Sequence, residues 1–120
     1  MICIILGTRP EIIKMCSVIN ACEEQNLDYF IIHTNQHYSE NMDKVIFRDL
    51  GLKNVDYNLQ VGSGIHGLQT GRMLGKIEDI LIKRKPKIVL IQGDTNTSFA
   101  GALAASKLGI KIGHIEAGLR

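Results

Sequence analysis

The segment that decides the fold is Leu90-Ile91-Gln92-Gly93-Asp94-Thr95-Asn96-Thr97-Ser98, which joins an apolar run to a row of small polar residues. The apolar run is typical of a buried strand, and the hydroxyl and amide residues after the glycine are typical of a helix start. In α/β proteins such a connection lies at the carboxyl edge of the sheet, where ligands bind. The segment therefore predicts an α/β fold with the Asp94 carboxylate at a ligand site.

The same alternation of strand and helix runs through the whole chain. Apolar runs predict strands over 2–6, 30–34, 56–59, 87–91 and 110–115, and amphipathic or alanine-rich segments predict helices over 9–24, 39–50, 65–83 and 96–108. Regular alternation indicates a Rossmann-like parallel sheet with helices on both faces, in three layers. Right-handed crossovers then favour the strand order 3-2-1-4-5.

In that order the first, fourth and fifth strands are neighbours, and a charged residue follows each of them. Arg9 follows the first strand, Asp94 the fourth and Glu116 the fifth, and Lys14 lies one turn into the first helix. A helix N-terminus with an arginine and a lysine is suited to phosphate. Two neighbouring carboxylates can shift each other's pKa and divide the roles of acid and base. These four residues form the predicted site.

Three of the four also have a structural interpretation. Arg9 could form an ion pair with Glu11 or Asp94, and Asp94 could cap the helix that starts at residue 96. Glu116 could pair with Arg120 or Arg9. A functional interpretation is favoured because two different strands are each followed by a carboxylate at the ligand edge.

The turn after the first strand carries a helix-start signal without a nucleotide fingerprint. Thr8 with Glu11 three residues later forms a capping box, and Pro10 suits the first helical turn. The residues Gly7-Thr8-Arg9 match neither the GxGxxG nor the GxxxxGK[ST] pattern. The turn therefore predicts an anion site that is neither a dinucleotide fingerprint nor a Walker loop.

The composition indicates one small domain with a packed core. The chain has 120 residues, 45% of them hydrophobic, and a formal net charge of +2. This charge is too small to indicate a nucleic-acid partner, and the run Lys83-Arg84-Lys85 is interpreted as a solvated helix end. No apolar run approaches the roughly 20 residues that cross a bilayer, so no membrane partner is predicted.

Cysteines, histidines and helix glycines add weaker predictions. The odd number of cysteines, without CxxC spacing, predicts reduced and mostly buried thiols in a cytoplasmic protein. The histidines share no metal-ligand spacing, so no metal site is predicted, and His114 is interpreted as a core residue. Gly71 and Gly75 lie inside a predicted helix, where glycine costs roughly 1 kcal/mol relative to alanine. This predicts close packing at both positions.

Four blocks of sequence together resemble a known family. They are Gly7-Thr8-Arg9-Pro10-Glu11-Ile12-Ile13-Lys14-Met15, Gln36-His37, Gly93-Asp94-Thr95 and His114-Ile115-Glu116-Ala117-Gly118-Leu119-Arg120. In this order and spacing they resemble the N-terminal half of the non-hydrolysing UDP-N-acetylglucosamine 2-epimerases, over essentially the whole chain. The departures are mild, with Asn96 where threonine is frequent and Gln92 where histidine is common.

The resemblance implies a fold and a reaction. Members have two Rossmann-like domains, similar to glycosyltransferase-B enzymes, and are usually homodimers. The sugar nucleotide lies in the cleft between the domains. They interconvert UDP-GlcNAc and UDP-ManNAc without NAD or a metal. A base removes the C2 proton, UDP leaves from C1 to give 2-acetamidoglucal, and proton and UDP return to form the other epimer.

The resemblance also implies roles for particular residues. Arg9 and Lys14 would bind the sugar nucleotide, with the diphosphate as the natural partner of their charge. Asp94 and Glu116 would be the carboxylates at the sugar, in proton transfer or in positioning, with the base not assigned between them. More loosely, Gln36 and Arg72 resemble contacts of an additional, activating UDP-GlcNAc molecule.

Residues 1–120 are accordingly expected to be an N-terminal domain, with the UDP-binding C-terminal domain absent from this chain. Half of a cleft is expected to bind UDP-GlcNAc weakly and to turn it over little or not at all. Three alternatives remain at this stage. They are a glycosyltransferase-like domain, a hydrolysing epimerase domain, and a non-catalytic flavodoxin-like binding module.

Overall fold

The computed structural model of the chain describes residues 1–34, 40–52, 55–61, 65–93 and 95–115. The strands are β1 (Ile2–Leu6), β2 (Tyr29–His33), β3 (Tyr57–Asn58), β4 (Ile88–Gln92) and β5 (Lys111–Ile115). The helices are α1 (Arg9–Glu24), α2 (Glu40–Asp49), α3 (His66–Arg84) and α4 (Asn96–Lys107). Every predicted element is present, and the main difference is the third strand, which is only two residues long.

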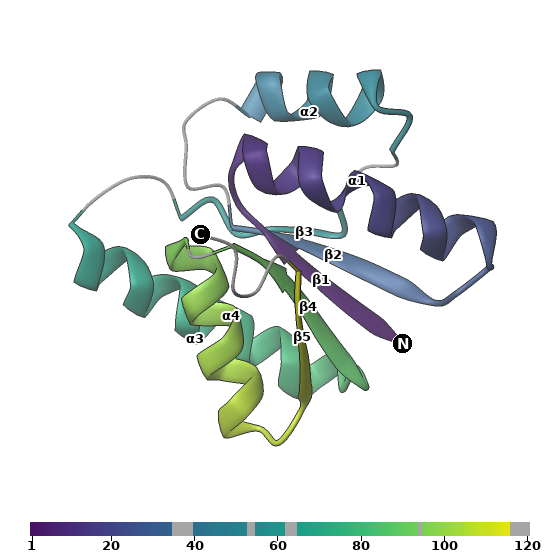
Figure 1. The fold of residues 1–120 in the computed structure, drawn as a ribbon. Helices are drawn as coiled ribbons and strands as arrows, with labels where there is room; N and C mark the ends of the chain where they lie inside the picture. Colours follow the sequence, from purple (N-terminus) through teal and green to yellow (C-terminus); the bar gives the residue numbers. More distant parts are fainter. Residues whose placement is uncertain (35–39, 53–54, 62–64, 94, 116–120) are drawn as a thin grey trace.

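The strands form one parallel sheet in the order β3-β2-β1-β4-β5, which confirms the predicted topology. Helices α1 and α2 cover one face of the sheet, and α3 and α4 cover the other (Figure 1). The reversal of strand order therefore falls between β1 and β4, whose carboxyl ends lie side by side. This is the position where ligands bind in open α/β sheets.

The central strand β1 is buried on both faces, which explains its continuous apolar sequence. Residues Cys3 to Leu6 have no exposed surface. Ile4 and Leu6 pack toward α1, whereas Cys3 and Ile5 pack toward α3 and α4. The two hydrophobic clusters therefore share β1, and the turn after β1 begins from a strand that is packed on both faces.

Small residues let α4 lie close to the sheet. Ala100, Ala104 and Ala105 are fully buried, and a Cβ atom at Gly101 would lie 3.1 Å from Ile5 Cδ1. The close packing predicted at Gly71 and Gly75 is wrong, because a Cβ atom at either position would meet nothing within 4 Å. The close packing of α4 on the sheet therefore requires glycine at position 101, whereas α3 has room for a side chain at positions 71 and 75.

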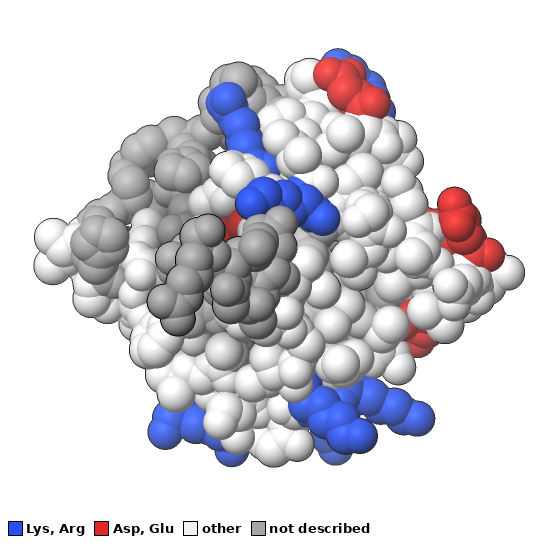
Figure 2. Space-filling view, in the orientation of Figure 1, with Lys and Arg blue, Asp and Glu red and all other residues white. Residues whose placement is uncertain are grey.

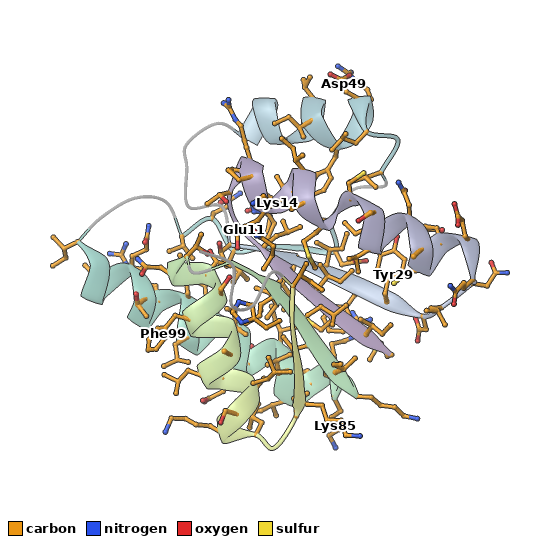
Figure 3. The ribbon with its side chains drawn as sticks, viewed as in Figure 1. Glu11, Lys14, Tyr29, Asp49, Lys85 and Phe99 are labelled. Carbon is orange, nitrogen blue, oxygen red and sulfur yellow. The ribbon has the colours of Figure 1, made fainter. Side chains whose placement is uncertain are left out.

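The basic run at the end of α3 has a structural role. Lys85 ends the helix in the left-handed conformation with a φ of 49°, and Lys83 forms an exposed ion pair with Asp79 at 3.0 Å. The Arg84 guanidinium lies 4.2 Å from the centre of the Phe30 ring and donates to the Tyr57 hydroxyl at 2.9 Å. The solvated helix end predicted from sequence is confirmed for Lys83 and Lys85, whereas Arg84 is half-buried against Phe30. Lys85 lies far from the carboxyl edge of the sheet (Figure 3).

The thiols agree with the prediction of reduced and mostly buried cysteines. Cys3 and Cys22 are buried and Cys16 is half-buried, and all three are free. Burial raises the pKa of the Cys3 thiol far above its ordinary value. Among the described residues, no helix combines the length and the apolar character that crossing a bilayer requires.

We expect Gly75→Ala to raise the free energy of unfolding by about 0.5–1 kcal/mol. The residue is exposed within α3, and the added methyl group meets no neighbour within 4 Å. Urea unfolding followed by circular dichroism measures the change. Gly113→Ala is the opposite control, because its Cβ atom would lie 2.6 Å from Leu90 Cδ2 and should lower stability. A loss of stability in Gly75→Ala would contradict the expectation.

Candidate functional site

The candidate site lies at the carboxyl edge, where the turn after β1 meets the turn after β4. Arg9 and Lys14 are exposed in the first two turns of α1. Figure 2 shows Lys and Arg side chains on the surface over the start of this helix. Asp94, Glu116 and Gln36 lie outside the described residues. The structure therefore describes the cationic half of the predicted site, on a helix N-terminus whose dipole favours anions.

The start of α1 is built by the predicted capping box. Thr8 is the N-cap, with φ −131° and ψ 162°, and its hydroxyl oxygen accepts the Glu11 backbone N–H at 3.5 Å. The Glu11 side chain turns back, and its Oε1 accepts the Thr8 hydroxyl at 2.9 Å and the Gly7 backbone N–H at 3.1 Å. These contacts satisfy donors that a helix N-terminus leaves without intrahelical partners. They also fix the turn that carries Arg9.

The same carboxyl group also contacts the start of α4. Glu11 Oε2 accepts the Thr95 hydroxyl at 3.0 Å and lies 3.3 Å from the Ser98 hydroxyl oxygen. Thr95 is itself the N-cap of α4 and accepts the Ser98 backbone N–H at 3.2 Å. Glu11 is only 1% exposed, and Figure 3 places it beneath the first turns of α1. One buried carboxyl group therefore joins the two turns of the candidate site.

Burial is the dominant influence on this carboxyl group and raises the pKa of Glu11 above its ordinary value of 4.5. Hydrogen bonds from Thr8, Thr95, Gly7 and Ser98 act in the opposite direction. The Ser98 hydroxyl has a single hydrogen and lies 2.5 Å from the Gln92 carbonyl oxygen but 3.3 Å from Glu11 Oε2, so its donation to the carboxyl group is the weakest of these hydrogen bonds.

Further polar contacts hold the start of α4 from its other side. The Thr97 and Thr34 hydroxyl oxygens lie 2.8 Å apart in a fully buried position beyond the end of β2. The Asn96 side-chain amide donates to Gln69 Oε1 on α3 at 3.0 Å. The first turn of α4 is therefore tied to β2 and α3 as well as to α1.

His114 differs from its predicted role as a core residue. It is exposed on the edge strand β5, and its Nε2 lies 2.6 Å from the Gly93 carbonyl oxygen. Gly93 has a positive φ of 70°, a conformation that favours glycine. The core interpretation failed because β5 lies at the edge of the described sheet, where Lys111, Ile112 and His114 are all exposed. His114 instead connects β5 to the turn after β4.

The sequence predicts Glu11 only as part of the capping box of α1, and its contacts to Thr95 and Ser98 were missed. Its spacing from Thr8 gave a sufficient local explanation, so nothing in the sequence drew attention to a second partner. The available signal was the Thr95-x-x-Ser98 pair, which places two hydroxyl groups at the start of a helix expected beside the same sheet edge. Pairing the two turns required their relative distance, which only the folded chain supplies.

Comparison with known proteins gives the family. The model of the family described as UDP-N-acetylglucosamine 2-epimerase matches residues 20–120. The chain belongs to this family. It is 71% identical over 117 residues to the UDP-N-acetylglucosamine 2-epimerase of Methanococcus maripaludis, covering 98% of this chain and 31% of that protein.

Two further relatives bear on the fold and the function. The crystal structure of Methanocaldococcus jannaschii UDP-GlcNAc 2-epimerase in complex with UDP-GlcNAc and UDP superposes with a TM-score of 0.95 at 63% identity, covering 99% of this chain and 33% of that chain. The UDP-2,3-diacetamido-2,3-dideoxy-D-glucuronate 2-epimerase of Pseudomonas aeruginosa is 52% identical over 97% of this chain and 33% of that protein. The fold is therefore that of one domain of these epimerases, and the chain spans about a third of its relatives' length.

We expect the stabilising contribution of Glu11 to decline as pH rises. Because burial raises its pKa in the folded state, the folded chain holds the proton to a higher pH than the unfolded chain does. The contribution is fully present below the ordinary value of 4.5 and is lost as pH rises through the folded pKa. The difference in unfolding free energy between the parent chain and Glu11→Gln should therefore fall above that pH, by at most about 1.4 kcal/mol per pH unit.

Urea unfolding of both chains between about pH 4 and pH 8 measures this difference. Glu24→Gln is the matched control, because Glu24 is exposed on the same helix and the change removes the same charge from the surface. A difference that grows with pH would mean that the folded state favours the ionised carboxylate, and the assignment would be wrong.

Proposed function

We propose that this chain is the N-terminal domain of a UDP-GlcNAc 2-epimerase, an isomerase that interconverts UDP-GlcNAc and UDP-ManNAc. The observation that carries the proposal is the close relationship, over nearly the whole chain, to proteins with this activity. The structure supports it through the exposed Arg9 and Lys14 at the N-terminus of α1. Their charges and the helix dipole provide an anion site suited to the diphosphate.

In this proposal the chemistry is elimination followed by addition. One carboxylate, Asp94 or Glu116, takes the C2 proton while the bond between C1 and the UDP oxygen breaks, giving 2-acetamidoglucal and UDP. A proton then returns to C2 on the opposite face, and the UDP oxygen bonds again to C1. Arg9 and Lys14 stabilise the charge that develops on the diphosphate as it leaves. No redox cofactor or metal takes part in this sequence of steps.

The reaction requires groups on both sides of the sugar nucleotide, and this domain supplies one side. We propose that the uridine side belongs to a second, C-terminal domain, as in a glycosyltransferase-B-like arrangement. The 120-residue chain alone should bind UDP-GlcNAc weakly and turn it over slowly or not at all.

The test is a fusion in which this chain replaces the matching third of the M. jannaschii enzyme, which is similar in fold and sequence. Proton NMR in D₂O follows the C2 proton of UDP-GlcNAc and the appearance of UDP-ManNAc. We expect epimerisation with exchange at C2, and we expect Asp94→Asn and Glu116→Gln each to lower kcat by about 100-fold or more. Glu24→Gln, an exposed change on the same domain, should change kcat by less than about twofold.

The products separate the alternatives. Free ManNAc with UDP would indicate a hydrolysing epimerase, and a glycosylated acceptor would indicate a glycosyltransferase-like domain. A folded fusion without any reaction, in which Asp94→Asn changes only stability, would favour a non-catalytic flavodoxin-like module. Measurable epimerisation by the 120-residue chain alone would contradict the need for a second domain.

One relative points to a second candidate substrate. The P. aeruginosa protein that acts on UDP-2,3-diacetamido-2,3-dideoxy-D-glucuronate is more than half identical to this chain. We therefore include that sugar nucleotide in the same assay. The larger kcat/KM identifies the substrate, since specificity between two sugars is the ratio of these values.

We further propose that the intact protein is a homodimer activated by a second UDP-GlcNAc molecule bound near Gln36 and Arg72. Arg72 is exposed on α3, one turn after Gln69, which bonds to Asn96 at the start of α4. This hydrogen bond connects α3 to the start of α4, beside the candidate site. Exposed apolar side chains on α3 and α4, including Leu68, Ile82 and Phe99, provide surface for a second subunit.

We expect Arg72→Ala in the fusion to reduce any sigmoidal dependence of rate on UDP-GlcNAc while the molecule remains folded. We expect Phe99→Glu to shift the sedimentation coefficient toward that of a monomer. Hyperbolic kinetics in the parent fusion would contradict the activating site, and a monomeric parent would contradict the dimer.

A further inference from the structure

The Glu11 carboxyl group is the point where two segments of the candidate site meet. It accepts from Gly7 and Thr8 in the turn after β1, and it contacts Thr95 and Ser98 at the start of α4. We propose that Glu11 is a positioning residue of the sugar-nucleotide site, which sets the first turn of α1 against the start of α4. This inference rests on the proposed function for its consequence in catalysis.

Burial distinguishes positioning from direct catalysis at this residue. Glu11 is 1% exposed, and its carboxyl oxygens lie within hydrogen-bond distance of four protein groups. A carboxyl group enclosed in this way has no surface on which a sugar nucleotide could rest. Its effect on a reaction must therefore pass through the groups that it holds.

The geometry of the fold explains why such a link is needed. Helices α1 and α4 cover opposite faces of the sheet, so the sheet separates most of their lengths (Figure 1). Their N-termini converge only at the carboxyl edge, and the Glu11 side chain spans this edge from one N-terminus to the other. The contacts of Thr97 and Asn96 hold the start of α4 against Thr34 and α3, and Glu11 adds the contact to the start of α1.

The position of the link in the chain gives it a specific consequence. Arg9 precedes Glu11 by two residues, and Asp94 immediately precedes Thr95. In the proposed reaction the first of these binds the leaving diphosphate and the second acts at the sugar. A misplacement of about 1 Å between such groups can lower a rate by about 100-fold. Loss of the link should therefore act more strongly on kcat than on the binding of UDP.

The first test needs no catalytic activity. Amide hydrogen exchange followed by NMR in the 120-residue chain measures the two N–H groups that depend on the link, those of Gly7 and Ser98. Glu11→Ala should raise their exchange rates by about tenfold or more, because the first loses its acceptor and the second loses a fixed partner. Glu24→Gln should leave both rates unchanged. Unchanged rates in folded Glu11→Ala would overturn the proposal.

The second test measures catalysis in the fusion with the M. jannaschii enzyme. Glu11→Ala should lower kcat by about 10- to 100-fold with a smaller change in the Kd for UDP. Glu11→Gln should recover most of the rate, because its amide oxygen still accepts from Gly7 and Thr8. A role in overall stability alone would leave kcat unchanged at a temperature where every variant is folded, and that result would overturn the proposal.

A double-mutant cycle separates the link from independent effects on the two turns. The loss of kcat from Glu11→Ala should become smaller in a Thr95→Val background, because the hydroxyl partner is already gone. The loss should keep its full size in a Thr97→Val background, because that hydroxyl bonds to Thr34 instead. Full additivity with Thr95→Val would overturn the proposal.

Two controls keep the outcomes separate. If Glu11→Ala does not fold, Glu11→Asp replaces it, because the shorter side chain withdraws from Thr95 while keeping the carboxyl group. We then expect the same changes in the exchange rates of Gly7 and Ser98 and in kcat. If the parent fusion is inactive toward sugar nucleotides, the proposed function fails. The exchange rates of Gly7 and Ser98 then decide by themselves whether Glu11 holds the two turns together.

Discussion

A carboxyl group without access to water needs hydrogen-bond donors around it, and in this domain the donors for Glu11 come from both sides of the sheet edge. The arrangement around the candidate site depends on this constraint. Gly7 and Thr8 must present their donors from the β1 turn, and Thr95 must present its hydroxyl from the start of α4. Each partner is also a helix cap or lies next to one, so local and long-range requirements are met by the same groups.

The sheet topology brings these groups to one place. Because β1 and β4 are neighbours and parallel, their following turns emerge at the same edge. The reversal of strand order between β1 and β4 places α1 on one face of the sheet and α4 on the other, so both helix N-termini point toward the same region. Positive helix ends and the exposed side chains of Arg9 and Lys14 make that region suitable for an anion, whereas Glu11 contributes no exposed negative charge.

Some predictions from sequence failed where the environment, rather than the local pattern, decides the outcome. Gly71 and Gly75 suggested close packing, but both face solvent, and the tight glycine is Gly101 against Ile5. His114 suggested a core residue, but β5 is an edge strand in the described sheet, and the ring reaches the Gly93 carbonyl oxygen. Neither difference could be predicted, because residue type and spacing do not report which neighbour lies above a position.

The sequence by itself determined the class of fold, the order of the strands and the identity of the charged residues after β1, since apolar periodicity, capping residues and crossover handedness are local or topological rules. The family follows from sequence as well, through blocks that span nearly the whole chain. Only the tertiary structure decided that Glu11 reaches from its own helix cap to Thr95 and Ser98, residues more than eighty positions away. A hydrogen bond depends on distances of a few tenths of an ångström, and packing of the whole domain sets those distances.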